Sequence, residues 1–154
     1  MEAALLAAHV LAGILFVGPA AVSASLFPRY VPVADPRPGS PRDEERSRRV
    51  ALALHRLTRV YGLLGIAVPV IGIALAFAQA RFGEIWITVA MIVTAVAGGL
   101  LALRIVPAQA AAIAVPPARV RLRALGALAG IFNLLWVIVV VLMIVRPGST
   151  TGLE

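Results

Sequence analysis

The sequence predicts an all-α fold in which four helices cross a membrane as an antiparallel bundle. Hydrophobic residues make up 61% of the 154 residues and charged residues only 14%, which is far from the balance of a soluble domain. The chain also contains four apolar runs of at least about 20 residues, the length that a helix needs to cross the ~30 Å hydrocarbon core of a bilayer. These two observations together indicate an integral membrane protein.

The four apolar runs define the expected helices, and a basic loop of residues 28–59 separates the first two. We expect a single domain of residues 1–154, because only this loop is larger than a connector. A short turn around Gly83 makes the second and third helices antiparallel neighbours. The apolar segment 107–118 either lies in the membrane interface or extends the third helix, and the sequence leaves both open. The runs cover approximately residues 3–27, 60–80, 85–106 and 124–145.

The distribution of arginine predicts the orientation. All 14 basic residues are arginines, and all but Arg81 and Arg146 lie in the first loop or around the third connection. The positive-inside rule places that side in the cytoplasm, with both termini outside. The absence of lysine indicates a GC-rich bacterial genome, so we expect a bacterial cytoplasmic membrane. Arginines at this boundary meet anionic lipid rather than nucleic acid.

The first loop is predicted to have two parts. Its prolines keep the first part extended, because proline lacks the N–H that a helix needs. Ser40 then supplies an N-cap and Pro41 a first helical position, so the second helix is predicted to begin near Pro41 and to extend into the cytoplasm. The spacing i,i+4 predicts two ion pairs: Glu44–Arg48 and Glu45–Arg49. The arginines expected to contact lipid or a partner are Arg42, Arg46, Arg48, Arg49, Arg56 and Arg59.

Small residues at helical spacing predict where the helices pack, because close approach stabilises helix pairs in a membrane. Pro69 is also expected to bend the second helix, and Asn133 to form a hydrogen bond between helices. The predicted packing residues are Gly62, Gly65, Pro69, Gly72, Gly126, Gly130 and Asn133.

Few side chains in this sequence could act in catalysis or bind a metal or cofactor. The chain has no cysteine, and no acidic or basic side chain lies deep in an apolar run, so paired carboxylates and proton relays lack their parts. We therefore do not expect an enzyme or a metal site. His9 is the one ionisable residue inside a run. It either forms a hydrogen bond across the bundle, with Thr88 or Gln79 at a suitable depth, or binds haem as a single axial ligand.

The second histidine, His55, is expected at headgroup level. His9 and His55 should differ in depth by roughly 20 Å at 1.5 Å per residue, whereas two axial nitrogens of one iron lie only ~4 Å apart. One haem therefore cannot use both histidines.

Two short motifs carry a resemblance. His9-x6-Phe16-x-Gly18 in the first run, followed by His55-Arg56-Leu57 before a Gly/Pro-rich run, resembles a family of uncharacterised bacterial predicted integral membrane proteins with four spans. The motif is more distantly similar to the membrane domains of copper-resistance D-type proteins and of four-helix protoporphyrinogen oxidases. This resemblance implies that His9 is an axial haem ligand. The sequence departs from that pattern in having Phe16 where tryptophan is usual, and in lacking a basic residue deep in a later span.

These observations predict a non-enzymatic integral membrane protein. Its expected role is that of an accessory or scaffold subunit of a larger membrane complex, or of a self-associating protein, with an arginine-rich loop that binds anionic lipid or a partner. The alternative is a redox protein that binds haem or another tetrapyrrole through His9. A third interpretation, a small-solute permease, requires a water-filled cavity lined by His9, Gln79 and Asn133.

Overall fold

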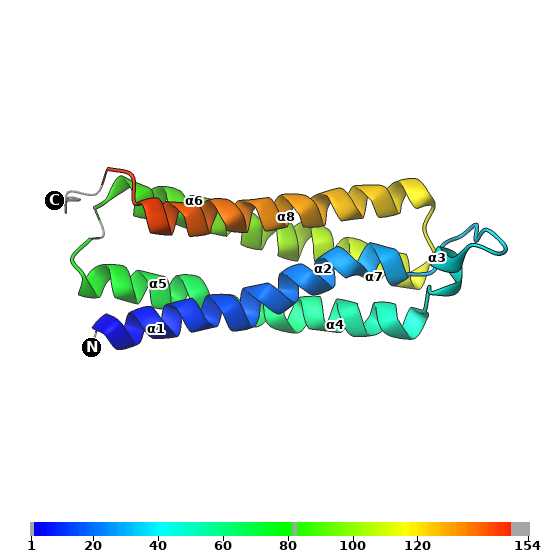
Figure 1. Cartoon of the computed structure of the whole chain (residues 1–154), viewed down its shortest axis with the longest axis horizontal. Helices are drawn as coiled ribbons and strands as arrows, with labels where there is room; N and C mark the ends of the chain where they lie inside the picture. Colours follow the sequence, from blue (N-terminus) through cyan, green and yellow to red (C-terminus); the bar gives the residue numbers. More distant parts are fainter. Residues whose placement is uncertain (1, 82, 149–154) are drawn as a thin grey trace.

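The computed structural model describes residues 2–81 and 83–148, and all regular secondary structure within them is helical. Four antiparallel helical segments form an elongated bundle (Figure 1). Each is long and apolar enough to cross a membrane, so the predicted four-helix fold is confirmed. The segments are Glu2–Tyr30, Arg48–Ala78, Ile85–Ala114 and Arg119–Val145.

Three of the four segments are built from shorter pieces. The first comprises α1 (Glu2–Ala12), the π-type turn η1 (Gly13–Val17) and α2 (Gly18–Tyr30). The second comprises α4 (Arg48–Leu64) and α5 (Ala67–Ala78), and the third α6 (Ile85–Leu100), the π-type turn η2 (Leu101–Ile105) and α7 (Val106–Ala114). The fourth, α8 (Arg119–Val145), is unbroken, and a single turn, α3 (Pro41–Glu44), lies in the first loop.

Each interruption lies within the turn or two before a proline. Pro19 follows η1, Pro107 follows η2, and Pro69 follows the break between α4 and α5. A proline inside a helix offers no N–H to the carbonyl four residues earlier, and its ring collides with that carbonyl. A wide turn or a local break relieves this conflict. The third segment therefore continues past Pro107 to Ala114, which decides the placement of segment 107–118.

The second helix begins at Arg48 rather than near Pro41, so this part of the prediction is wrong. The side chain of Arg46 donates to the carbonyl oxygens of Pro28 at 3.1 Å and Val31 at 2.6 Å, and the Ser47 N–H donates to the Tyr30 oxygen at 2.8 Å. These bonds satisfy carbonyls at the end of α2, and they require the chain to leave the helix between α3 and α4.

The Ser40 cap and the two predicted ion pairs also differ from the structure. The Ser40 side chain makes no capping hydrogen bond, and its carbonyl oxygen instead accepts from the Asp43 N–H at 2.9 Å. Among the described residues, Glu44–Arg48 and Glu45–Arg49 do not pair; Glu45 lies 3.5 Å from Arg29. The break before α4 removes the i,i+4 geometry on which both pairs depend.

The bundle is packed differently at its two ends. The arginine end holds α3 and the links 31–47 and 115–118, and here α2, α4, α7 and α8 enclose the apolar core (Figure 1). Phe27, Val31 and Ile105 are fully buried there. The terminal end holds residues 79–81 and 83–84, which connect the second and third segments, and there α1 packs on α5 while α6 packs on α8. The second and third segments are antiparallel neighbours at the arginine end, where α4 packs on α7, whereas at the terminal end each packs mainly on another segment.

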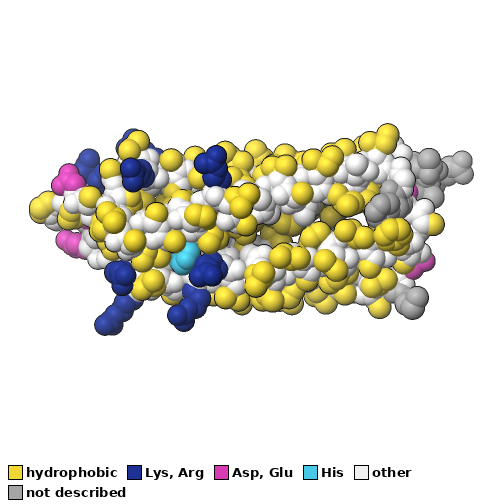
Figure 2. Space-filling view, turned by 180° about the vertical axis from the view of Figure 1, so that it is seen from behind, with side chains coloured by type: hydrophobic (Ala, Val, Ile, Leu, Met, Phe, Trp, Pro, Cys, Tyr) yellow, Lys and Arg dark blue, Asp and Glu magenta, His cyan; other side chains and the backbone are white. Residues whose placement is uncertain are grey.

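Large apolar side chains cover the sides of the bundle, while arginines gather over one end of the visible face (Figure 2). Leu63, Ile85 and Leu103 are 70% to 75% exposed. A surface of this kind suits hydrocarbon, since side chains that face lipid need no polar cover.

Candidate functional site

The arginine end contains an open cleft of about 620 Å³ between α2 and α8, bordered by α3 and the loop before it. Three segments distant in sequence contribute its arginines, and we call it the arginine cleft. Those arginines are Arg29, Arg37, Arg42, Arg46, Arg119 and Arg123.

Asp43 on α3 fixes the wall of the arginine cleft. Its Oδ1 accepts from Arg46 Nε at 3.0 Å, and its Oδ2 accepts from an Arg119 terminal nitrogen at 2.6 Å and from the Arg37 backbone N–H at 2.8 Å. The same nitrogen of Arg119 donates to the Asp35 carbonyl oxygen at 3.2 Å. The Asp43 carboxylate is 3% exposed, so one buried acid ties the loop to the start of α8.

The hydrogen bond from the Arg119 side chain holds the pKa of Asp43 well below its usual range. The backbone N–H of Arg37 and the side chain of Arg46 act in the same direction. Hydrogen bonds to the charged form of a carboxyl stabilise that form. Asp43 therefore stays ionised and keeps Arg46 and Arg119 in place.

Three other arginines of the cleft are free to bind an anion. Among residues 2–81 and 83–148, the guanidinium groups of Arg37, Arg42 and Arg123 take part in no ion pair. Their positive charges therefore remain available at the cleft.

The structure divides the six arginines that the sequence selects. Arg42 and Arg46 line the arginine cleft, and Arg46 holds the loop rather than facing a ligand. The other four lie exposed on α4, outside the cleft: Arg48, Arg49, Arg56 and Arg59. Sequence reasoning missed the contributions of Arg29, Arg37, Arg119 and Arg123. The spacing of Arg119 and Arg123 by one helical turn was the available signal.

A buried polar network crosses the core near the arginine end. The His55 Nδ1 lies 3.0 Å from Gln109 Oε1, the Gln109 Nε2 donates to Thr58 Oγ1 at 3.4 Å, and Thr58 bonds the Ser23 hydroxyl at 2.9 Å. Gln109 and Thr58 are fully buried. The network joins the first three segments, and within it His55 is half-buried against α7.

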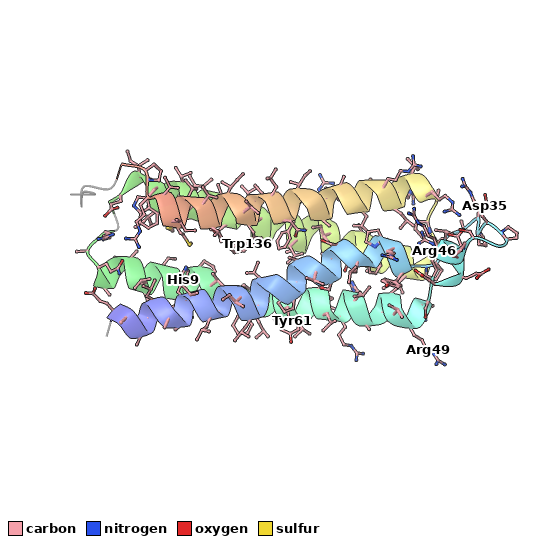
Figure 3. The ribbon with its side chains drawn as sticks, viewed as in Figure 1. His9, Asp35, Arg46, Arg49, Tyr61 and Trp136 are labelled. Carbon is pink, nitrogen blue, oxygen red and sulfur yellow. The ribbon has the colours of Figure 1, made fainter. Side chains whose placement is uncertain are left out.

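His9 lies in the other half of the molecule, as Figure 3 shows. Its Nδ1 lies 3.0 Å from the Val68 carbonyl oxygen on α5, so neither Thr88 nor Gln79 is its partner. Gly72 makes room for the ring, because a Cβ atom there would lie 2.8 Å from the His9 Cε1. The partner of His9, Val68, lies 13 residues after His55 in the second segment. The two histidines are therefore far apart along the bundle.

His9 lines a cavity of about 260 Å³, which we call the His9 cavity. A second cavity of about 350 Å³ adjoins it and shares the lining residues Pro69, Met91 and Thr94. Gln79 also lines the His9 cavity. Asn133 does not: its Nδ2 donates to Ser25 Oγ at 2.9 Å, so the cavity that the permease interpretation requires is not formed.

The surroundings of His9 can be tested against the haem that the resemblance implies. Ligating histidines usually donate their other ring N–H to a carbonyl or carboxylate, and the bond to Val68 meets this condition. The His9 cavity alone is small for a macrocycle. Its volume of about 260 Å³ is below the ~300 Å³ at which pockets for drug-sized ligands begin, so a haem held by His9 would also have to occupy the second cavity of about 350 Å³.

The predicted packing glycines fall into three groups. Gly62 and Gly72 meet other helices closely, since added Cβ atoms would lie 2.7 Å from Leu101 Cδ2 and 2.8 Å from His9 Cε1. Gly65 is at the break before Pro69 and meets only carbonyls of its own turn. Gly126 and Gly130 have open space, so they mediate no close packing within the described chain.

Comparisons with protein-family models, with curated proteins and with solved structures find no match for this chain.

Proposed function

We propose that this protein is an integral membrane protein that binds anionic phospholipid headgroups in the arginine cleft. The observation that carries the proposal is the cleft of about 620 Å³ in which Arg37, Arg42 and Arg123 have no ion pair among the described residues. In this proposal the arginine end faces the cytoplasm of a bacterium and both termini lie outside, as the positive-inside rule predicts.

The chemistry of the cleft suits phosphate. Guanidinium groups present a planar fork of N–H donors that matches phosphate oxygens, and they remain charged at all relevant pH values. The backbone N–H groups at the start of α8 add the positive end of a helix dipole near Arg119. Because Asp43 already holds the loop against α8, the site that a phosphate would enter is largely formed before it binds.

The position of the cleft favours a lipid over a free anion. Leu122 and Gly126 line it beside the arginines, and the apolar sides of α2 and α8 continue from there. A phosphate held by the arginines can therefore keep its acyl chains against the bundle. Anionic lipid also attracts basic groups at the membrane surface, by about 1 kcal/mol for each arginine. Such a fixed lipid contact suits an accessory or scaffold role, because it sets the depth of the bundle in the membrane.

The experiment compares lipid binding by two triple variants. The cleft variant is Arg37→Gln/Arg42→Gln/Arg123→Gln, and the matched control is Arg48→Gln/Arg49→Gln/Arg56→Gln on α4, which removes the same charge elsewhere. Each protein in neutral detergent is titrated with phosphatidylglycerol and with phosphatidylcholine, and the melting temperature is recorded. A ligand that binds only the folded state raises that temperature.

We expect phosphatidylglycerol to raise the melting temperature of the wild type and of the control, and to lose most of this effect on the cleft variant. Phosphatidylcholine should have little effect on all three. An equal loss in both triple variants would mean that diffuse charge, and not the cleft, attracts the lipid, and it would overturn the proposal.

A further inference from the structure

The His9 cavity is a second place where a ligand can bind, at the opposite end of the bundle from the arginine cleft. It lies between the α1/α5 pair and the α6/α8 pair, and the second cavity continues it toward the middle of the bundle. Both are lined mainly by apolar side chains and lie between helices that can cross a membrane. A ligand that is soluble in lipid can therefore reach them.

The hydrogen bond of His9 determines what its ring offers to a ligand. A carbonyl oxygen only accepts, so the bond to Val68 places the ring proton on Nδ1 and leaves a lone pair on Nε2. His9 is 8% exposed, and among the described residues Nε2 has no hydrogen-bond partner. Gly72 and Val68 hold the ring in this orientation. The His9 ring that lines the cavity thus carries an acceptor, Nε2, for which the described residues provide no donor.

The walls favour a flat ring beside that acceptor. Trp86, Met91 and Met143 line the His9 cavity, and aromatic and thioether groups pack well against aromatic rings. A volume of about 260 Å³ suits a single substituted ring. Gly98 and Gly99 leave an apolar slot in the second cavity for an attached chain.

We propose that these two cavities bind a membrane-soluble quinol, with one ring hydroxyl donating to His9 Nε2 and the apolar chain in the second cavity. The inference concerns binding alone and goes beyond the proposed headgroup site. The oxidised quinone presents only carbonyl acceptors, which cannot donate to Nε2. The cavity should therefore distinguish two ligands of nearly identical shape by their hydrogen-bonding groups.

The test measures the affinities of decylubiquinol and decylubiquinone for the purified full-length protein in phosphatidylcholine nanodiscs, with the quinol kept reduced under anaerobic conditions. We expect the quinol to bind about tenfold more tightly, the ratio that one hydrogen bond to a buried acceptor provides. Equal affinities, or tighter binding of the quinone, would overturn the proposal.

His9→Asn and His9→Ala show whether the preference depends on the ring. The asparagine amide N–H can donate to the Val68 oxygen and keep the helix contact, but its Oδ1 is still an acceptor. His9→Ala removes both groups and should lose the preference for quinol. His55→Asn, at the arginine end, should retain it. A quinol preference that survives His9→Ala would place the ligand elsewhere.

An absorption spectrum of the same preparations provides an independent check. A haem band that disappears in His9→Asn would show that iron occupies Nε2 and would overturn the quinol proposal. A protein without such a band that prefers quinol supports it. Neither result depends on the arginine cleft. A failure of the quinol proposal would therefore leave the headgroup proposal intact, and the reverse also holds.

Discussion

Gly72 on α5 leaves the space that the imidazole of His9 on α1 fills: a Cβ atom at residue 72 would lie 2.8 Å from the His9 Cε1. The ring of His9 also donates to Val68, one turn earlier on the same helix. This pair of contacts fixes the first and second segments against each other at the terminal end, where the apolar core does not reach.

Gly72→Ala should therefore destabilise the protein. The new methyl group must displace the His9 ring, and overpacking of this kind typically costs about 1–3 kcal/mol. The measurement is the melting temperature in nanodiscs. Gly98→Ala is the control, because no atom lies within 4 Å of a Cβ at residue 98. Equal melting temperatures for the two variants would contradict the close contact.

Gln109→Leu should lower stability although leucine is apolar and of similar size. It leaves the His55 Nδ1 without its partner Gln109, while Thr58 keeps its bonds to Ser23 and Leu54, and a polar group that loses its partner on burial costs about 1–3 kcal/mol. A double-mutant cycle with Thr58→Val measures the coupling between the two side chains. Additive effects would show that the network is not cooperative.

The stability of the arginine end should depend on pH through Asp43. Its folded-state pKa lies below the unfolded value of about 4, so its stabilising contribution is complete above that pH and is lost as the pH falls through the folded pKa. We expect a constant melting temperature from pH 5 to 8 and a fall below about pH 4. Asp43→Asn should show a smaller acid-dependent fall, while Glu44→Gln, which changes an exposed acid of the same turn, should behave as the wild type.

The orientation can be tested with single cysteines, since the chain contains none. Ser40→Cys lies at the arginine end and Gly83→Cys in the turn at the terminal end. In intact cells an impermeant thiol reagent should label residue 83 and not residue 40, and disruption of the cells should expose both. Labelling of residue 40 in intact cells would reverse the proposed topology.

The helices could be predicted from the sequence because length and hydropathy are local properties. Each predicted apolar run lies almost wholly within a helical segment, and Pro69 follows a break as expected. The effect of Pro107 could not be predicted, because a proline either ends a helix or is accommodated by a wide turn. Which of the two occurs depends on the packing of α7 against α4.

The candidate sites were harder to predict because they join distant parts of the chain. The arginine cleft requires Arg123 on α8 to meet Arg37 and Arg42 in the first loop, which no sequence spacing reveals. Gln109 is one polar residue in an apolar segment, and its burial follows only once the third helix passes Pro107. His9 was identified, but its partner is a backbone carbonyl, and every residue type at position 68 offers the same atom.

The uneven distribution of the core has a consequence for how this protein can evolve. None of the residues that line the His9 cavity belongs to the apolar core cluster at the arginine end. Substitutions such as Met91→Leu or Met143→Leu therefore change what the cavity accepts with little cost to the half of the molecule that holds the fold together. Selection can act on the ligand and on the fold almost independently, so relatives of this chain should share the packing around Phe27 and Ile105 while differing in the residues that surround His9.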